Sequence, residues 1–319
     1  MEIRPSILDA IGNTPLVRLS RIHPPGNLVA KVEYVNPGGS TKDRIGLLMI
    51  EAAERDGLLA PGGTIVEPTS GNTGVGLAMV AAIKGYRLVC VMPDKMSQEK
   101  IDGLRAYGAE VHVAPTDVAP DDPRSYYSVA ARLVSEIPGA FSPNQYANDA
   151  NPEAHYRSTG PEIWDQTDGT VDQLVVGVGT GGTITGTARF LKERNPAIVF
   201  VLVYAVGSIY TADSDDDVHT YLTEGVGEDF WPDTFDRTLV DRFIRVSDRE
   251  AYSMARRLAA TEGVLVGSSG GLATVGALRV AAGAPDDLVV VILPDSGRSY
   301  VSKVFNDTWM ADHGLLEEE

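Results

Sequence analysis

Short apolar runs rich in β-branched residues alternate along this chain with segments of helical periodicity, and this alternation constrains the fold most strongly. The apolar runs lie at residues 28–34, 64–68, 87–92, 110–114, 173–178, 198–204 and 288–294. Several of them are apolar on both faces, which is typical of buried parallel strands. The helical segments lie at residues 43–57, 73–85, 97–107, 124–136, 153–166, 184–194, 248–262 and 270–282. The sequence therefore predicts an α/β protein with mainly parallel sheets.

Two stretches, residues 64–93 and 173–204, have the same plan of strand, loop of small residues, helix and strand. We expect them to belong to two lobes that face one cleft. The predicted larger lobe comprises residues 1–40 and 146–319, and it includes the early strand at 28–34. The smaller lobe comprises residues 41–145. Right-handed crossovers would bring the loops after the strands to one edge, where ligands bind.

Composition narrows the function further. With 319 residues, 43% of them hydrophobic, the chain can form one large core or two modest ones. Its net charge of −17 argues against nucleic acid or an anionic membrane as a partner. The only cysteine, Cys90, lies in an apolar run and should be buried, and no Cys/His cluster has the spacing of a metal site. Without a secretory signal or a stretch of ~20 apolar residues, we expect a soluble cytoplasmic protein.

The segment GVGTGGT at residues 177–183 matches the G-x-G-x-x-G pattern between a strand and a helix. A dinucleotide site would also need an acidic residue about 20 positions later, to bind the ribose. The next strand ends instead in Val203, Tyr204, Ala205 and Val206. The glycines, the two threonines and the start of the following helix fit a single phosphate better.

Three further loops carry polar groups. TSGNTG at 69–74 offers hydroxyls, an amide and N–H groups at a helix start, which suits a carboxylate. PDSGRS at 294–299 follows a buried strand and can present the Ser296 hydroxyl. Either loop alone could equally be an ordinary helix cap. In NPGGSTKDR at 36–44, Lys42 follows small residues that would let a ligand approach, and crowding by apolar groups would favour its neutral, nucleophilic form.

Together these four stretches resemble the fold-type II pyridoxal-phosphate enzymes, and within them the cysteine synthase and cystathionine β-synthase group. IGNTPLVRL at 11–19 and QYANDANPEAHYRSTGPEIW at 145–164 are also similar to that group. EGVGEDFWP at 224–232 and LPDSGRSYVSKVFNDTWM at 293–310 resemble the cystathionine β-synthase catalytic core more than the O-acetylserine-using branch. The resemblance implies two three-layer α/β/α lobes with pyridoxal 5'-phosphate in the cleft between them.

The resemblance also implies roles for individual residues. Lys42 would form the Schiff base, Asn72 would bind the ring hydroxyl oxygen and Ser296 would face the pyridine nitrogen. The cofactor phosphate would be held by Gly179, Thr180, Gly181, Gly182 and Thr183. The substrate carboxylate would be held by Thr69, Ser70, Thr73 and Gln145. No metal is implied.

The implied reaction is β-replacement on L-serine or an O-activated serine through an aminoacrylate, with Lys42 moving the protons. The leading assignment is L-serine plus L-homocysteine to L-cystathionine. The alternatives are cysteine synthesis from O-acetyl-L-serine and sulfide, or a β-substituted alanine synthase of specialised metabolism. From other classes, a NAD-dependent oxidoreductase and a non-catalytic binding relative stay open. We expect a homodimer with amino-acid substrates, and no nucleic-acid or membrane partner.

The chain departs from its relatives after the strand at 198–204. Cystathionine β-synthase cores have a turn close to Asp-Pro-Glu-Gly-Ser there, whereas residues 204–208 read Tyr-Ala-Val-Gly-Ser. This is either drift in a turn that still folds or a pocket for a different second substrate. We also expect neither the haem segment of the animal enzymes nor a C-terminal regulatory pair. His112 and His155 are expected to be structural, and Lys31 is the one rival to Lys42.

Overall fold

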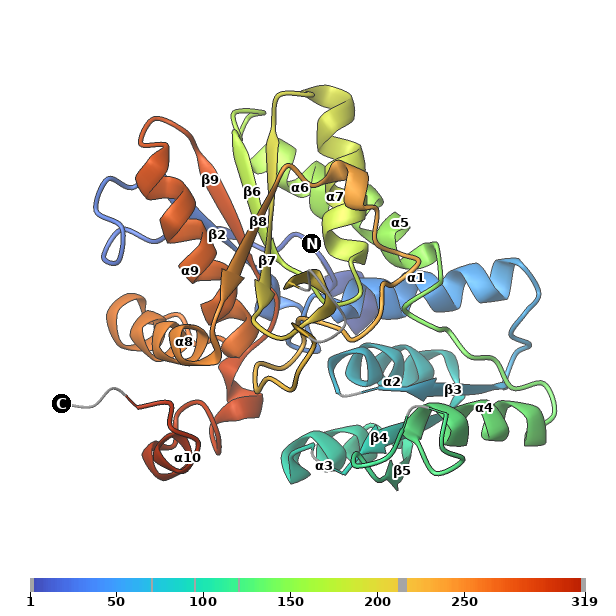
Figure 1. Ribbon diagram of the computed structural model, residues 1–319. Helices are drawn as coiled ribbons and strands as arrows, with labels where there is room; N and C mark the ends of the chain where they lie inside the picture. The colour runs from blue at the N-terminus through green and yellow to red at the C-terminus, as the bar shows by residue number, and fades with distance from the viewer. Residues whose placement is uncertain (1–2, 70, 95, 120, 212–216, 317–319) are drawn as a thin grey trace. The chain divides into compact units, whose positions relative to one another are not determined.

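The computed structural model describes residues 3–69, 71–94, 96–119, 121–211 and 217–316 (Figure 1). Its contacts divide the chain into two compact units. Unit 1 takes its residues from 1–11 and 36–151, and unit 2 takes its residues from 12–35 and 152–319. The α/β class predicted from the alternating pattern is confirmed. The predicted lobe boundaries, and the ligand group that each lobe would bind, stay predictions.

Unit 2 contains a six-stranded sheet that is parallel except at one edge. Its strands, in spatial order, are β1 (Leu16–Arg18), β2 (Leu28–Val32), β9 (Val289–Leu293), β6 (Gln173–Gly177), β7 (Val199–Ala205) and β8 (Arg242–Val246). Only β1 runs antiparallel to its neighbour. Because β2 pairs with β9 from Leu28 opposite Val289, the early strand lies in the sheet of unit 2, as expected.

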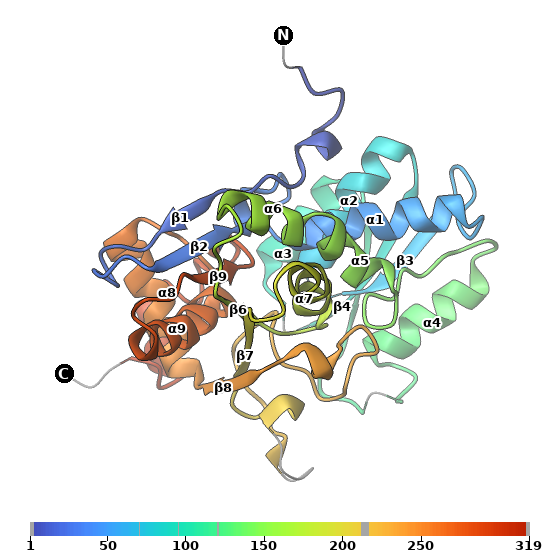
Figure 2. The same ribbon diagram turned by 90° about the horizontal axis from the view of Figure 1, so that it is seen from above.

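The apolar runs of unit 2 are apolar on both faces because both faces are covered. In β6, Val175 packs toward α8 (Asp248–Glu262) and α9 (Ser268–Gly283). Leu174 and Val176 point the other way, into a second cluster with α6 (Thr159–Gln166) and α7 (Gly182–Arg194). The two pairs of helices lie on opposite faces of the sheet (Figures 1 and 2). This alternation is the side-chain period of two that a strand imposes.

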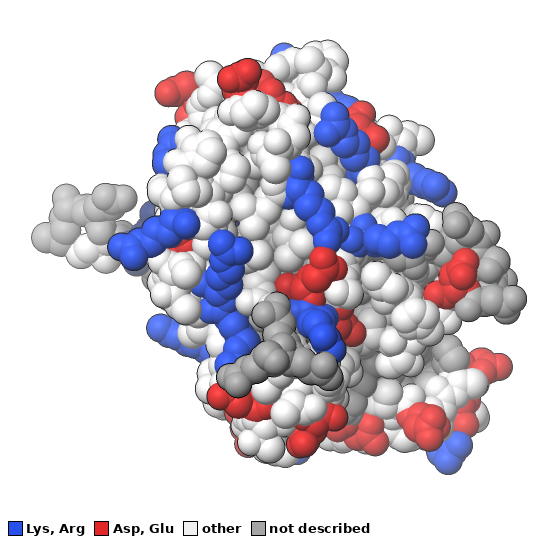
Figure 3. All heavy atoms as spheres, turned by 60° about the vertical axis from the view of Figure 1, so that its left-hand side comes forward, with Lys and Arg blue, Asp and Glu red and all other residues white. Residues whose placement is uncertain are grey.

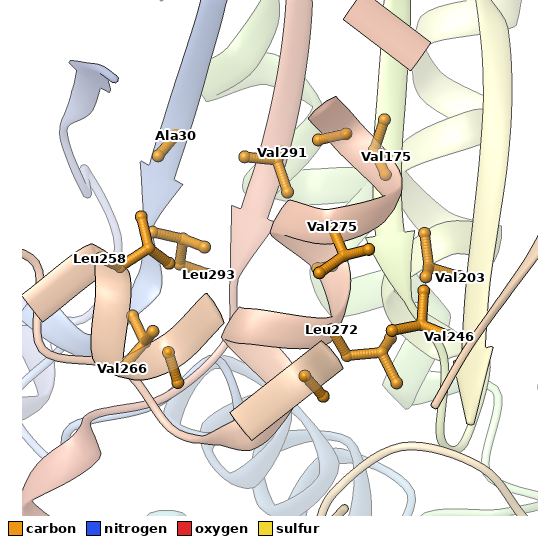
Figure 4. Close-up of a cluster of buried hydrophobic side chains, with 14 of the residues drawn as sticks. Ala30, Val175, Val203, Val246, Leu258, Val266, Leu272, Val275, Val291 and Leu293 are labelled. Carbon is orange, nitrogen blue, oxygen red and sulfur yellow. The ribbon is translucent and has the colours of Figure 1, made fainter. Parts of the chain in front are cut away.

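Helices α8 and α9 cross closely beneath the sheet, and Figure 4 shows the valines and leucines gathered there. The crossing depends on Gly271, because a Cβ atom at this position would collide with the carbonyl oxygen of Ala251. On the outer side of α8 the ring of Tyr252 stacks on Trp309, at 5.7 Å between centroids. Trp309 belongs to the short α10 (Asp307–Asp312).

Unit 1 contains a parallel sheet of β3 (Thr64–Pro68), β4 (Arg87–Pro93) and β5 (Glu110–Ala114). Helix α4 (Tyr126–Glu136) covers one face, where it packs on a cluster that includes Val66, Val89 and Val91. Unit 1 also contains the helices α1 (Lys42–Arg55), α2 (Asn72–Lys84) and α3 (Gln98–Ala106). Helices α1 and α2 cross through glycines, since a Cβ at Gly46 would lie 2.7 Å from the carbonyl carbon of Gly76.

The structure differs from the expected elements in several places. The helix expected over 153–166 is two helices, α5 (Ala150–Arg157) and α6, with the backbone at Ser158 turned to φ −130° and ψ −66°. The strand expected at 28–34 ends at Val32, because a 3-10 turn, η2 (Glu33–Val35), follows. Strands β1 and β8 and helix α10 were not expected. Further 3-10 turns are η1 (Ile7–Ala10), η3 (Ile209–Thr211), η5 (Arg237–Leu239) and η6 (Gly297–Tyr300).

The face drawn in Figure 3 does not carry the negative net charge as one continuous patch. On the face drawn in Figure 3, Lys and Arg side chains are interspersed with Asp and Glu. Within the described part of the chain, no group of His, Cys, Asp and Glu side chains is arranged to hold a metal ion. No helix of that part has the length and apolar character required to cross a bilayer.

The α8–α9 crossing gives a direct test of the packing. We expect Gly271→Ala to lower the free energy of unfolding by about 1–3 kcal/mol, because the added methyl group meets the backbone of the neighbouring helix. Gly283→Ala, at the end of the same helix with nothing within 4 Å, is the control, and it should be neutral or stabilise by up to about 1 kcal/mol. Urea unfolding would measure both. Equal effects would contradict the close crossing.

Candidate functional site

In unit 1, the loop before Lys42 is held by a carboxylate. The N–H of Gly38 donates to Oδ2 of Asp43 at 2.6 Å, and a Cβ at Gly38 would lie only 2.5 Å from Oδ1 of the same side chain. The N–H of Lys42 donates to Oγ of Ser40 at 3.2 Å. Together these contacts explain the small residues of NPGGSTKDR, which fold back on the first turn of α1. Lys42 is the first residue of that helix and is half-buried.

The crossing of α1 and α2 brings Lys42 close to the first turn of α2. A Cβ at Gly76 would lie 2.6 Å from the carbonyl oxygen of Lys42, so only glycine permits this approach. Next to Lys42, Thr41 is buried, and its Oγ1 has no hydrogen-bond partner within the described residues. A buried hydroxyl without a partner is costly, which points to a ligand at this end of α1.

The loop that opens α2 is organised by Thr69. Its Oγ1 accepts from the N–H groups of Gly71 at 3.2 Å and Gly74 at 3.3 Å. Gly71 has φ 139°, a conformation that requires glycine. Asn72 and Thr73 then form the first turn, whose N–H groups have no intrahelical acceptor and favour an anion. Ser70, also predicted to bind the carboxylate, lies outside the described residues.

Gln145 comes from a distant part of unit 1 and meets this loop. The Thr73 hydroxyl donates to its Oε1 at 2.6 Å. Its backbone N–H donates to Glu67 at 3.2 Å, and its carbonyl oxygen accepts from Nδ2 of Asn151 at 2.7 Å. Sequence reasoning singled out Thr73 and Gln145 but missed Glu67 and Asn151. A glutamate within a buried strand was the available signal for Glu67.

The glycine loop of unit 2 joins β6 to α7. A Cβ at Gly181, where φ is 82°, would collide with Phe235, and one at Gly179 would lie 2.9 Å from the carbonyl oxygen of Gly225. These glycines therefore make room for the protein's own chain at 225–235. The Tyr210 hydroxyl donates to the Gly179 carbonyl at 2.7 Å.

Further contacts hold the rest of this loop. The hydroxyl of Thr234 donates to the Thr180 carbonyl at 2.6 Å. Thr183, in the first turn of α7, contacts a buried histidine: Nε2 of His155 lies 3.2 Å from its Oγ1. The other ring nitrogen of His155 lies 2.8 Å from the hydroxyl of Thr159. The loop thus presents the N-terminus of α7 with Gly182 at its start, as an anion site requires.

Ser296 follows β9 in unit 2 and begins η6. Its Oγ accepts from the N–H of Arg298 at 3.3 Å. A hydroxyl that accepts in this way keeps its own proton for another acceptor. Beside it, the buried carboxylate of Asp295 accepts from the hydroxyl of Tyr300 at 2.5 Å and that of Ser269 at 3.3 Å. These bonds hold the turn that presents Ser296.

The other candidate reactive residues, Lys31, His112 and Cys90, have surroundings that indicate structural roles. Lys31 is fully buried, and its Nζ donates to the Thr14 carbonyl and to Glu162 at 2.6 Å each. Such an amine is held as a charged donor, whereas a nucleophile must be neutral. His112 pairs with Glu110 at 2.7 Å on the surface. Cys90 is buried, as expected from the sequence.

Burial perturbs two groups next to each other in unit 1. Glu67 and Cys90 lie opposite each other in the β3–β4 pair. Burial raises the pKa of Glu67 to about 7, against hydrogen bonds from Asn144, Gln145 and Ser142 that lower it. Burial, with a smaller contribution from Glu67, raises the pKa of the Cys90 thiol to about 12, so this thiol is not a nucleophile near neutral pH.

Comparison with known proteins identifies relatives of the whole chain. A family model described as "Pyridoxal-phosphate dependent enzyme" matches residues 7–295. The cystathionine beta-synthase of Oryctolagus cuniculus is 50% identical over 326 aligned residues, which cover 100% of this chain and 59% of that protein. The chain thus spans less than two thirds of this curated relative.

Two solved structures are similar over nearly their full length. A hydrogen sulfide-producing enzyme from Fusobacterium nucleatum has a TM-score of 0.88 and 39% identity, covering 94% of this chain and 99% of that one. An O-ureido-L-serine synthase has a TM-score of 0.89 and 38% identity, covering 97% of this chain and 100% of that one.

The raised pKa of Glu67 predicts a specific dependence of stability on pH. The folded protein binds this proton more tightly than the unfolded chain, whose glutamate has the ordinary pKa of 4.5. The contribution of Glu67 is therefore fully present below pH 4.5 and is lost as the pH rises to about 7. A shift of this size corresponds to about 3 kcal/mol.

The test compares the free energy of unfolding of the wild type and Glu67→Gln across this pH range. The free energy of unfolding of the wild type should fall relative to that of the variant as the pH rises, even if the two differ by a constant amount at low pH. Glu51→Gln, on the exposed side of α1, is the control and should run parallel to the wild type. Parallel curves for Glu67→Gln would contradict the raised pKa.

Proposed function

Because the chain belongs to the family of pyridoxal-phosphate dependent enzymes, we propose that it catalyses β-replacement on L-serine or an O-activated serine. The leading assignment is L-serine plus L-homocysteine to L-cystathionine and water. What carries it is the 50% identity, over the whole chain, to a protein named cystathionine beta-synthase. Family membership confirms pyridoxal 5'-phosphate as the cofactor. It gives no support to the NAD-dependent oxidoreductase or the non-catalytic relative considered from the sequence.

The residues present fit this cofactor. Its phosphate needs hydrogen-bond donors, and the loop at Gly179–Thr183 offers N–H groups and hydroxyls at the start of α7. Its aldehyde needs an amine, and Lys42 follows Thr41, whose buried hydroxyl has no partner in the described part of the chain. Its ring nitrogen needs a partner, and Ser296 has a proton to donate.

Each residue then has a proposed task. Gly179, Thr180, Gly181, Gly182 and Thr183 bind the phosphate. Lys42 holds the cofactor covalently, and Asn72 binds its ring oxygen. The substrate carboxylate is bound by Thr69, Ser70, Thr73 and Gln145. This last group supplies an anion site around the first turn of α2, where the helix dipole favours a negative charge.

Pyridoxal phosphate supplies, when bound, an electrophilic carbon and a ring that accepts electron density as the substrate loses its α-proton. Ser296 would limit how much electron density the ring accepts, because a hydroxyl cannot keep the ring nitrogen protonated as a carboxylate does. Electron density that is less delocalised favours prompt loss of a β-substituent over transamination. The residue at position 296 thus directs the reaction toward β-replacement.

Lys42 also moves the protons. With its Nζ free of the cofactor, Lys42 would take the α-proton and return a proton to the leaving hydroxyl of serine, which would depart as water. The thiol of homocysteine would then add at the β-carbon, and its proton would pass through Lys42 to the α-carbon. One carbon–oxygen bond would be broken and one carbon–sulfur bond formed. Positioned proton transfer of this kind typically contributes ~10²–10⁴-fold to the rate.

The competing assignment is a reaction with a nucleophile other than homocysteine, and two observations favour it. The turn at 204–208 lacks the acidic-proline sequence, and Gly207, at φ 98°, packs tightly against His219. The solved neighbours are named for hydrogen sulfide production and O-ureido-L-serine synthesis. Sulfide with O-acetyl-L-serine, or a nitrogen nucleophile, is therefore the alternative. We further infer a cytoplasmic homodimer, since symmetric dimers are the commonest assembly.

The decisive experiment records the visible absorbance of the cofactor-loaded protein before and after L-serine, and then identifies products by mass spectrometry. We expect an L-serine-dependent spectral change and cystathionine in the presence of homocysteine. Lys42→Ala should lower turnover by at least ~10²-fold, since it removes positioned proton transfer, whereas Lys84→Ala should not. Turnover only with O-acetyl-L-serine and sulfide would move the assignment to cysteine synthesis. No visible band with added cofactor would overturn the enzyme assignment.

Position 296 gives a separate prediction. Ser296→Ala removes one neutral hydrogen bond, about 1 kcal/mol, so the dissociation constant of the cofactor should rise about fivefold. Ser296→Asp should increase transamination relative to β-replacement, measured as 2-oxo acid released per cystathionine formed. Ser299→Ala, in the same turn, is the control. An unchanged product ratio in Ser296→Asp would refute the role given to the hydroxyl.

A further inference from the structure

A carboxylate inside the sheet of unit 1 has no place in the chemistry described so far. Glu67 lies near the end of β3, is fully buried, and stands opposite Cys90 of β4. The same burial raises its pKa to about 7, so an ionised Glu67 lowers stability near neutral pH. Folding alone therefore does not explain a glutamate at this position.

The partners of Glu67 all belong to one short segment. Oε2 accepts from the N–H of Asn144 at 3.0 Å, and Oε1 accepts from the N–H of Gln145 at 3.2 Å. The hydroxyl of Ser142 lies 3.5 Å from Oε2, which is a weak contact. This segment reaches the edge of the sheet at Phe141, whose N–H donates to the Thr64 carbonyl. Each carboxylate oxygen thus serves one of two successive N–H groups.

These bonds add to those that hold a left-handed turn. Asn144 has φ 49°, a region that asparagine adopts more readily than most residues with a side chain. Its carbonyl oxygen also accepts from the N–H groups of Ala147 and Asn148. Gln145 follows directly, and Asn151 fixes its carbonyl oxygen from the other side. The backbone of Gln145 is therefore bonded in both directions, once by a carboxylate and once by an amide.

The side chain of Gln145 is held as well, and its orientation decides what it can do. Its Oε1 accepts the Thr73 proton at 2.6 Å, so the donors on Nε2 are left, and they have no acceptor within the described residues. Gln145 is 5% exposed, so its side chain is held in place by its surroundings while the Nε2 donors stay available to a ligand with an acceptor. Thr73 has used its only proton, and it can offer a ligand its N–H but not its hydroxyl.

We propose that Glu67 is a positioning residue for the substrate carboxylate, holding the backbone of Asn144 and Gln145 so that Nε2 of Gln145 donates to that carboxylate. The inference rests on the proposed function in one respect, namely that Gln145 binds the carboxylate of an amino acid. It is independent of the leaving group and of the nucleophile. Glu67 acts through Gln145 and does not touch the substrate.

The test uses L-alanine and L-alaninamide, which lack a β-leaving group and differ only in the carboxylate. Their dissociation constants are read from the visible absorbance of the cofactor-loaded protein. Glu67→Gln replaces one acceptor by a donor that opposes an N–H group. It should weaken L-alanine about tenfold, as expected for one hydrogen bond to a charged group, and L-alaninamide less than about twofold.

Matched variants separate positioning from general damage. Ser142→Ala removes a contact to the same carboxylate but leaves both N–H bonds, and it should change neither constant. Asn151→Ala removes the opposite restraint on Gln145 and should resemble Glu67→Gln, which keeps the test available where Glu67→Gln folds poorly. In a Gln145→Ala background, Glu67→Gln should have no further effect on L-alanine, because coupled residues are not additive.

A readout without cofactor completes the design. Amide hydrogen exchange in the cofactor-free protein should be at least about tenfold faster at Asn144 and Gln145 in Glu67→Gln, and unchanged in Ser142→Ala. Equal weakening of L-alanine and L-alaninamide, additive effects with Gln145→Ala, or no binding of L-alanine by the wild type would overturn the proposal. Binding of L-alanine with the expected pattern, but no turnover of any serine donor, would support it while the proposed function failed.

Discussion

Parallel pairing of the strands is the constraint on which every candidate site residue depends. In a parallel sheet all strands end at one edge, so the chain must leave that edge through a loop and, in these units, enter a helix or a 3-10 turn. Thr69 lies between β3 and α2, Gly181 between β6 and α7, and Ser296 between β9 and η6. The polar groups of each unit are therefore found at the starts of helices and 3-10 turns, where first-turn N–H groups have no acceptor within their own helix. The site chemistry follows from the topology.

Residues remote in the chain then give these loops their shape. Phe235 and Gly225 pack so closely on the glycine loop that Cβ atoms are excluded at Gly181 and Gly179. The G-x-G-x-x-G pattern, which in sequence suggested a nucleotide, therefore reflects in part the packing of the protein on itself. Asp43 does the same for Gly38, whose missing side chain makes room for a carboxylate. A glycine motif alone cannot tell these two causes apart.

The dependence on distant residues explains which features could be predicted from the sequence and which could not. Seven strands were predicted from short apolar runs, and most of these runs are buried in the sheets, although the edge strand β5 is partly exposed. The edge strands β1 and β8, with exposed residues such as Arg18 and Arg242, carry a weaker apolar signal. The loop residues were found because helix starts have local signatures. Glu67 and Tyr210 were missed because their meaning depends on partners 31 to 78 positions away. The break at Ser158 was missed although Gly160 and Pro161 follow it, and proline in a first turn is typical of a helix start.

The direction in which each hydroxyl proton points distinguishes the candidate groups from one another. The Thr73 hydroxyl donates its proton to Gln145, so the backbone N–H of Thr73 is the donor that it can offer to an anion. Ser296 accepts from a backbone N–H and keeps its proton, which suits an unprotonated ring nitrogen. The Thr183 hydroxyl lies within hydrogen-bond distance of Nε2 of His155, and which of the two donates depends on the tautomer of the histidine. If Thr183 donates to a phosphate, His155 must carry its proton on Nε2 and accept at Nδ1 from the Thr159 hydroxyl. The tautomer of this buried histidine and the direction of the Thr183 hydroxyl are thus linked.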